Sequence, residues 1–406
     1  MRPSNAVRTV WDAEAIDTSH LGFRSIQKIA TIHASSGFIR RNPTNNKYLL
    51  SGIAQRNNLR SEYMYISPNI LTANRRRLVR RAFHIPFLMY GMLSVSFGLV
   101  MYLFGVLLVV PRYLLGLNAL LLPINEWIVW YSGVPIMVGF GLALGDLLFL
   151  LSFKRRHNRV RADDVACREL TVALTAYNDE ESIGSAVSDF LSHPLVRRVL
   201  VVSNNSVDAT FERAVVAGAI AVNETAPGYG RCVFRCLSEA VNYEDTELIV
   251  LCEGDLTFRA FDIDKLVAFA PHADIVNGTR TVECLREYST QLSTFMYYGN
   301  LFVGKLLEAK HLGRSTITDV GTTYKLCRKS ALVQLLPQLC PAVNLEFNAH
   351  FLDAALGDGL TVVECPITFH ARVGISKGGN TSDLRALRVG FRMMMGMIFG
   401  WRWLEQ

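Results

Sequence analysis

Two acidic side chains, Glu253 and Asp255, stand two residues apart at the end of the apolar run LIVLCE. Carboxylate oxygens are the ligands that hard divalent cations prefer, and Mg²⁺ is usually held by one or two of them together with water and phosphate oxygens. Gly254 lies between the two acids and lets a bound group approach the backbone closely. The pair is therefore a candidate site for a divalent metal.

Polar and glycine residues follow the neighbouring apolar runs in the same way: Tyr177, Asp179, Ser203, Asn204, Gly228 and Gly230. In α/β proteins, ligands bind in the crevice beyond the carboxyl ends of parallel strands, so these are candidate binding residues. The chain has no G-x-x-x-x-G-K-[ST] motif, and no G-x-G-x-x-G follows an apolar run. Its residues therefore do not favour a P-loop or a dinucleotide site.

The elements that must position these residues alternate in type after Cys167. The runs ELTVALTAY, VRRVLVVS and ELIVLCE are short, apolar and rich in β-branched residues, which predicts buried strands. The segments after them carry apolar residues at three- and four-residue spacing, which predicts helices. This alternation indicates an α/β fold with a Rossmann-like, mainly parallel sheet and helices on both faces.

Composition excludes several classes of protein. Of 406 residues, 50% are hydrophobic and only 19% are charged, which argues against a disordered or fibrous chain. The eight cysteines are scattered without a C-x-x-C pair, so neither a zinc site nor a disulfide framework is expected. The net charge of +7 is modest, and we expect no nucleic-acid partner.

Two long apolar segments predict a transmembrane helical hairpin over residues 83–153. Phe83–Val110 has no Asp, Glu, Lys or Arg, and Trp127–Phe153 is interrupted only by Asp146. Each is long enough to cross a hydrocarbon core of about 30 Å. Helices are expected because lipid tolerates only backbone that satisfies its own hydrogen bonds.

Basic clusters flank the hairpin at residues 74–81 and 154–161, which places both termini, and with them the α/β domain, in the cytosol under the positive-inside rule. Residues 1–82 read as a cytosolic tail that is partly disordered. Residues 381–406 combine arginines with Met, Phe and Trp, which favours an amphipathic helix in the membrane interface. A helix packed on the soluble domain is the alternative for this last segment.

The motifs resemble, in their order and spacing, those of family 2 glycosyltransferases with a GT-A fold. That family reads P-x-Y-N-E-x-x-x-I, V-V-D-(D/N)-x-S-x-D-x-T, a G-x-G turn and D-x-D, where this chain has TAYNDEESI, VVSNNSVDAT, GYG and EGD. The later blocks NGTRT, TDVGTTYKL and VVECPITFHARVGISK resemble its dolichyl- or polyprenyl-phosphate sugar synthase branch. The resemblance covers about residues 168–378, and the ordered set is more specific than any single block.

The chain departs from the family pattern at several positions. Thr175 replaces the proline, Asp179 replaces a glutamate, and Glu253 replaces the first aspartate of D-x-D. Ser203 and Asn204 stand where acidic residues are usual, which leaves the identity of the nucleotide base open.

The resemblance implies a nucleotide-sugar site built from Tyr177, Asp179, Ser203, Asn204, Gly228, Gly230, Glu253 and Asp255. Glu253 and Asp255 would hold Mg²⁺ or Mn²⁺ against the diphosphate of the donor. Tyr177 would pack on the base, and Asp179 would accept a hydrogen bond from it.

The resemblance also implies residues for catalysis and for the acceptor. Asp319 would lie near the donor sugar and the acceptor. Glu346, His350 or Asp353 would occupy the position of a later helix where the family carries an acid. Arg372, Ser376 and Lys377 are the acceptor-side candidates. Arg372 and Lys377 would hold the acceptor phosphate or the departing diphosphate, since arginine and lysine are the usual phosphate ligands.

The expected function is a membrane-attached inverting glycosyltransferase, EC 2.4, that transfers a hexose from a nucleotide-diphosphate sugar to a lipid-linked acceptor such as polyprenyl phosphate. A glycan or glycolipid acceptor in surface polysaccharide synthesis is one alternative. A catalytically inactive membrane scaffold is another, because the acidic positions are altered. Whether the chain forms a homo-oligomer stays open.

Overall fold

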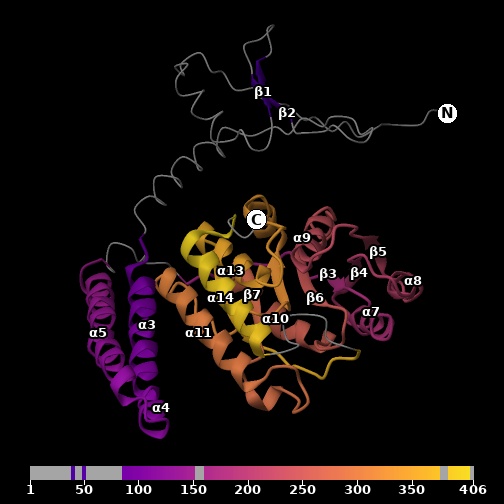
Figure 1. Cartoon of the computed structure of the whole chain (residues 1–406). Coiled ribbons are helices and arrows are strands. Elements are labelled where there is room, and N and C mark those ends of the chain that lie inside the picture. The colour runs from indigo at the N-terminus through magenta and orange to yellow at the C-terminus, as the bar shows by residue number, and fades with distance from the viewer. Residues whose placement is uncertain (1–37, 42–47, 52–84, 151–159, 375–382, 403–406) are drawn as a thin grey trace, which may run out of the picture. The chain divides into compact units, whose positions relative to one another are not determined.

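The computed structural model describes residues 38–41, 48–51, 85–150, 160–374 and 383–402 (Figure 1). The chain divides into two compact units, Met1–Ile85 and Pro86–Gln406. In the first unit, β1 (Phe38–Arg41) pairs with β2 (Tyr48–Ser51) as an antiparallel hairpin. Most of the expected cytosolic tail, residues 1–82, lies outside the described residues.

A seven-stranded sheet forms the centre of the second unit, in the order β5-β4-β3-β6-β8-β7-β9. Strand β8 runs antiparallel to β6 and β7, and the other pairings are parallel. The mainly parallel α/β sheet expected from the sequence is therefore confirmed. The strands are β3 (Leu170–Ala176), β4 (Val196–Ser203), β5 (Ile220–Asn223), β6 (Leu248–Glu253), β7 (Ile275–Thr279), β8 (Lys325–Arg328) and β9 (Val362–Pro366).

Helices cover both faces of the sheet, because alternate side chains of a strand point to opposite faces. On β6, Val250 is buried among the helices of one face and Leu251 among those of the other. The first face carries α7 (Ile183–Leu191), α8 (Thr210–Val216) and α10 (Ile263–Phe269). The second face carries α9 (Tyr229–Ala240), α11 (Thr294–Lys310), α12 (Lys329–Leu335) and α13 (Phe347–Asp358). Short 3₁₀ turns occupy Ala260–Asp262, Ala270–His272, Glu283–Leu285 and Leu336–Gln338.

The last described helix, α14 (Asp383–Phe399), packs against α11 and α13. Its Met393 and Met397 are buried, whereas Leu384, Phe391 and Phe399 are exposed. One face of α14 thus joins the core of the domain, and an apolar part of its surface stays uncovered.

Two antiparallel apolar helices precede the sheet. The first consists of α3 (Phe87–Leu107) and α4 (Val109–Leu114), and the second of α5 (Asn118–Gly145) followed by a π turn at Asp146–Leu150. By length and composition alone, Phe87–Leu114 and Asn118–Phe149 could each cross a membrane. The second helix begins at Asn118, nine residues before the expected apolar segment, because most of the predicted connection is itself helical.

Small and polar residues spaced seven apart let α3 and α5 approach closely. The buried positions that share this spacing are Gly91, Gly98 and Gly105 on α3, and Asn125, Ser132 and Gly139 on α5. A Cβ added at Gly91 would lie 2.7 Å from the carbonyl oxygen of Gly139. Asn125 Nδ2 donates to the Gly105 carbonyl at 2.6 Å, and the Leu88 amide donates to Asp146 Oδ2 at 2.9 Å. Close backbone contact and interhelical hydrogen bonds are the usual forces between helices in lipid.

We expect Gly91→Val to destabilise this hairpin, because the new side chain would meet the backbone of α5. Overpacking of this kind costs about 1–3 kcal/mol. Gly141→Val is the matched control, since a Cβ at Gly141 meets nothing within 4 Å among the described residues. Thermal unfolding of both variants in detergent checks the prediction, and equal midpoints would contradict it.

Candidate active site

The carboxyl ends of three neighbouring strands bring most of the predicted donor-site residues together. Thr175 of β3 pairs with Glu253 of β6, and Ala176 pairs with Ser203 of β4. The loops that follow β3, β4 and β6 therefore begin at the same edge of the sheet. Ligands of α/β sheets bind beyond the edge where parallel strands end, which is the edge that these predicted residues share.

One guanidinium group bridges two of the predicted site carboxylates. Arg372 Nη1 lies 3.0 Å from Asp255 Oδ2, and Arg372 Nη2 lies 2.8 Å from Asp179 Oδ1. Asp179 follows β3, Asp255 follows β6, and Arg372 follows β9, so three distant parts of the chain meet here. Arg372 was expected at an acceptor phosphate; in this structure it is paired with the donor-site acids.

Burial makes this acidic cluster electrostatically costly. Asp255 is 2% exposed, and burial together with the charge of Glu253 raises its pKa to about 6, although Arg372 and Thr257 favour the carboxylate. Burial also raises the pKa of Asp179, against the opposing effect of Arg372. A second positive charge at the cluster would relieve this repulsion.

Glu253 and Asp255 fit a divalent cation by their donor chemistry. Their oxygens are hard ligands for such a cation. The charge of Glu253 raises the pKa of Asp255, so a bound cation would stabilise the ionised form of both carboxylates. The described residues contain no group of three or more His, Cys, Asp or Glu side chains that could hold a metal. A cation held here would therefore need phosphate or water for its remaining ligands.

Glu253 is held at one carboxylate oxygen by Thr323. Thr323 Oγ1 donates to Glu253 Oε1 at 2.6 Å, and the Thr323 hydroxyl lies 2.5 Å from that of Tyr229. Burial and the nearby charge of Glu253 raise the pKa of Tyr229 well above its ordinary value, so this phenol stays protonated. Neither Tyr229 nor Thr323 was predicted from the sequence, although Tyr229 lies in the GYG turn and Thr323 in the TDVGTTYKL block.

Asn204 makes two hydrogen bonds that an aspartate, the other residue of the family pattern at this position, could not make together. Its Nδ2 donates to the Ala226 carbonyl at 2.9 Å, and its Oδ1 accepts from the Gly228 amide at 3.0 Å. A carboxylate could accept but could not donate, so only an amide makes both contacts. Asn204 thereby fixes the glycine turn that begins α9.

The two glycines of that turn serve different purposes. Gly228 has a φ of +133°, which favours glycine, and a Cβ at Gly230 would lie 1.7 Å from the Val343 carbonyl oxygen. Gly230 therefore permits close packing against the loop before α13. Of the remaining donor-site candidates, Tyr177 is 47% exposed, and buried Ser203 bonds to Ser206 at 2.9 Å.

Asp319 is buried and fully engaged with Arg280. Arg280 Nε and Nη2 lie 2.7 Å and 2.8 Å from the two Asp319 carboxylate oxygens, and the Gly321 amide donates to the same group. Burial alone would raise the pKa of Asp319, but Arg280 and the backbone donors outweigh it and hold the pKa below its ordinary value. This geometry suits a residue that positions Arg280 rather than one that accepts a proton.

The structure does not bring Glu346 or His350 into contact with the acidic pair. Glu346 pairs with Arg392 of α14 at 2.7 Å, and His350 Nε2 accepts from the Cys340 amide at 2.8 Å. The α13 side chain that reaches the Glu253 network is Asn348, whose Nδ2 lies 3.2 Å from Thr323 Oγ1. Nothing in the sequence distinguished Asn348 from the other polar residues of this helix, His350 and Asp353.

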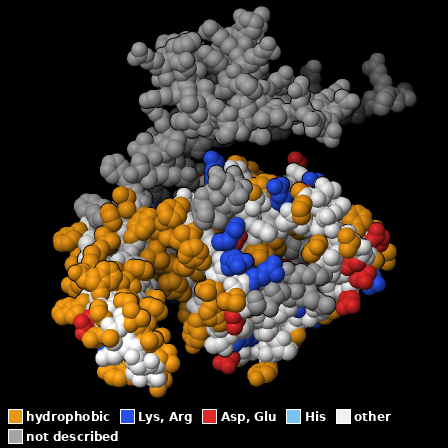
Figure 2. All heavy atoms as spheres, viewed as in Figure 1, with side chains coloured by type: hydrophobic (Ala, Val, Ile, Leu, Met, Phe, Trp, Pro, Cys, Tyr) orange, Lys and Arg blue, Asp and Glu red, His pale blue; other side chains and the backbone are white. Residues whose placement is uncertain are grey.

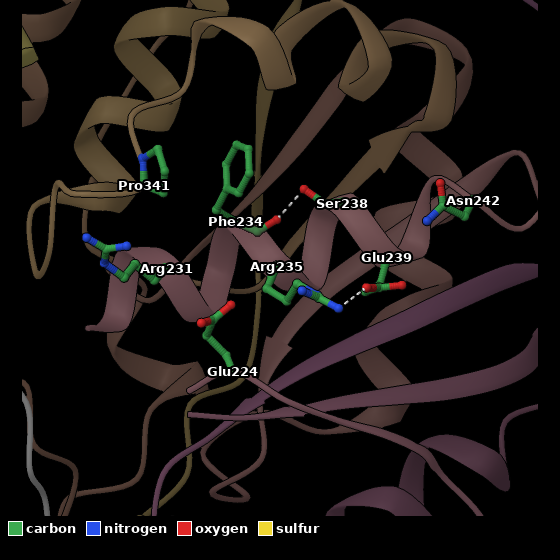
Figure 3. A pocket seen from close by; sticks show the side chains of 8 residues that line it. All are labelled: Glu224, Arg231, Phe234, Arg235, Ser238, Glu239, Asn242 and Pro341. Atoms are coloured by element: carbon green, nitrogen blue, oxygen red, sulfur yellow. Dashed lines mark hydrogen bonds and ion pairs between the residues drawn. The ribbon is translucent and has the colours of Figure 1, made fainter. Parts of the chain in front are cut away.

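The other two predicted phosphate ligands, Ser376 and Lys377, lie outside the described residues, so their role stays a prediction. A separate surface cavity of about 400 Å³ runs along α9 (Figure 3). Arg235 and Glu239, which line it, form an ion pair at 2.6 Å. No predicted site residue is among the described residues that line this cavity: Glu224, Arg231, Phe234, Arg235, Ser238, Glu239, Asn242 and Pro341.

Comparison with known proteins identifies the family. No family model matches the chain. The glycosyltransferase AglJ of Haloferax volcanii is 30% identical over 230 residues, which cover 56% of this chain and 69% of that protein. The dolichyl-phosphate hexose transferase of the same organism is 26% identical over 210 residues, or 52% of this chain and 86% of the relative. The chain belongs to the glycosyltransferases.

Other matches are shorter or more distant. An uncharacterized glycosyltransferase of Mycobacterium tuberculosis is 37% identical over 112 residues, or 27% of this chain and 48% of the relative. The chain thus spans about half the length of such mycobacterial relatives. The crystal structure of glucosyl-3-phosphoglycerate synthase from Mycobacterium tuberculosis with Mn²⁺, UDP and product aligns with a TM-score of 0.42 and 18% identity, over 57% of this chain and 80% of that one.

The contacts of His350 predict a pH-dependent loss of stability. Burial lowers the pKa of His350 from 6.5 to about 4. Between these two pH values the imidazole is protonated in the unfolded chain and neutral in the folded chain. Between pH 6.5 and 4 the folded state should therefore lose up to about 3 kcal/mol from this residue. His350→Gln, which keeps an acceptor for Cys340, should unfold with a shallower pH dependence in thermal melts over this range. Identical slopes would count against a buried neutral imidazole.

Proposed function

We propose that the chain is a membrane-attached, inverting family 2 glycosyltransferase that moves a hexose from a nucleotide-diphosphate sugar to polyprenyl phosphate. The observation that carries this proposal is the acidic pair Glu253 and Asp255 at the carboxyl edge of the sheet, beside Asp179. Family membership supplies the reaction class, and the apolar hairpin supplies a reason for a lipid acceptor.

The donor would bind across the ends of β3, β4 and β6. Glu253 and Asp255 would hold a divalent cation, Mg²⁺ or Mn²⁺, which neutralises the charge of the departing nucleoside diphosphate. Tyr177 is half-exposed and would pack on the base, with Asp179 as the hydrogen-bond acceptor for base or ribose.

Arg372 would exchange partners when substrates bind. Its guanidinium already lies within 3.0 Å of Asp255, so a phosphate near a metal at Asp255 is also near Arg372. Arginine binds phosphate through two parallel hydrogen bonds, and a phosphate oxygen can replace a carboxylate oxygen in that geometry. We assign it to the acceptor phosphate or the leaving diphosphate.

The transfer itself needs no strong base. An ionised oxygen of the acceptor phosphate attacks the anomeric carbon from the face opposite the nucleotide, and the carbon–oxygen bond to the diphosphate breaks. The electron pair of that bond leaves with the nucleoside diphosphate, and the configuration at the anomeric carbon inverts. Because an ionised phosphate has no proton to lose, the engaged states of Asp319, Glu346 and His350 do not impede the reaction.

Several surfaces support attachment to a membrane. Figure 2 shows hydrophobic side chains spread over the α3–α5 hairpin. Helix α11, which contacts α3, exposes Phe295 and Tyr298, and its neighbour α14 exposes Leu384 and Phe391. Helix α14 also carries arginines suited to anionic headgroups, so it would lie in the interface while its other face packs on the domain. The similarity to a dolichyl-phosphate hexose transferase supports a lipid phosphate as acceptor.

The acceptor is tested by incubating membranes that contain the full chain with radiolabelled nucleotide-sugars and Mg²⁺ or Mn²⁺, and then extracting the lipids. We expect label in a lipid that mild acid hydrolyses, because a sugar phosphodiester at the anomeric carbon is acid-labile. Label found only in polymer would contradict a polyprenyl phosphate acceptor. Absence of both label and nucleotide-dependent thermal stabilisation would indicate an inactive scaffold.

Asp255→Asn should lower metal-dependent transfer by about 100-fold or more, since loss of one group that stabilises developing charge commonly has an effect of this size. Asp264→Asn is the control, because that carboxylate lies on α10 with a side chain that is 77% exposed. Initial rates of both variants against metal concentration check the prediction. Wild-type rates in Asp255→Asn would mean that the metal binds elsewhere.

A further inference from the structure

A chain of hydrogen bonds runs from the interior of the domain to the carboxylate of Glu253. Lys325 Nζ donates to Asn348 Oδ1 at 3.3 Å, and Asn348 Nδ2 donates to the Tyr229 hydroxyl at 3.0 Å. The Tyr229 and Thr323 hydroxyls are 2.5 Å apart, and Thr323 Oγ1 lies 2.6 Å from Glu253 Oε1. Lys325, Asn348 and Thr323 are all buried.

The two ends of this chain fix the direction of every bond between them. An ammonium group can only donate, and a carboxylate can only accept. Since Thr323 gives its hydroxyl proton to Glu253, the Thr323 oxygen must accept from the Tyr229 hydroxyl. Every donor in the series therefore points toward Glu253, and bonds aligned in this way strengthen one another in a buried site.

The series joins Glu253 to the neighbouring strand β8 and to two helices, α9 and α13, on one face of the sheet. Tyr229 begins α9, Lys325 begins β8, and Asn348 lies in the first turn of α13. A free glutamate side chain samples several rotamers, and ordering it costs up to about 2 kcal/mol. The bond from Thr323 restricts Glu253 by its Oε1 atom, which leaves Oε2 as the oxygen available to another ligand.

We propose that Thr323, itself held by Tyr229 and Asn348, is a positioning residue that aims Glu253 as the second carboxylate ligand of the metal site. The inference rests on the proposed function, in which Glu253 and Asp255 share a divalent cation. It goes beyond that function by assigning a role to the side chains that hold Glu253 from behind. Groups that orient metal ligands typically contribute about 10–100-fold to metal affinity.

The adjacent threonines provide a matched test. Both are buried, but the Thr322 hydroxyl has no hydrogen-bond partner among the described residues, whereas the Thr323 hydroxyl bonds to Glu253. We expect Thr323→Val to weaken Mn²⁺ binding about tenfold, measured on the full chain in detergent by the electron paramagnetic resonance signal of free Mn²⁺. Thr322→Val should bind Mn²⁺ like the wild type, and Thr323→Ser, which restores the hydroxyl, should recover most of the affinity.

A double-mutant cycle separates this inference from the proposed function. In a Glu253→Gln background, Thr323→Val should cause no further loss of Mn²⁺ affinity, because its effect acts through that carboxylate. Equal Mn²⁺ affinity in Thr323→Val and Thr322→Val would overturn the positioning role, even if Asp255→Asn abolishes binding. Unchanged Mn²⁺ binding in both Asp255→Asn and Glu253→Gln would instead overturn the metal site itself. Metal-free melting temperatures of the two threonine variants identify any general loss of folding.

Discussion

The arrangement of the site depends on concentrating negative charge where little water reaches it. Asp179 and Asp255 are both largely buried, and Glu253 raises the pKa of Asp255 further. Arg372 supplies one positive charge between Asp179 and Asp255, which makes the cluster tolerable without a ligand. Removing one partner of such a buried pair is costly, so a ligand that displaces Arg372 must bring its own compensating charge. A metal together with a phosphate group meets that requirement.

The sheet order places these charges. Strands β3, β4 and β6 are neighbours although other elements separate them along the chain, so the loops after them share one edge. The antiparallel strand β8 lies on the other side of β6, where the segment that leads into it brings Thr323 to Glu253. Helix α13 then contributes Asn348, not the acidic or histidine side chains beside it. The strand order thus determines which loops meet at the site, and the side chains on those loops determine its chemistry.

Much of this could be predicted from the sequence. The strands ending near Tyr177, Ser203 and Glu253 were readable because each is a short apolar run followed by polar residues. Which side chain of α13 would face the site could not be predicted, because the rotation of a helix about its axis depends on how it packs against the sheet and α14. The pairing of Arg372 with two acids was also beyond prediction, since it joins residues 193 positions apart. The extension of the second apolar helix back to Asn118 was missed because polar residues there obscured a helical segment.

In the proposed function, Glu253 and Asp255 would hold one divalent cation that neutralises the charge of the donor diphosphate. Anomalous X-ray diffraction from crystals of the full chain grown with Mn²⁺ and a nucleoside diphosphate tests it most directly. We expect a single strong anomalous peak within ligand distance, about 2.0–2.6 Å, of oxygens from both carboxylates, with Arg372 moved toward phosphate. A peak remote from both acids, with Arg372 still bridging Asp179 and Asp255, would contradict it.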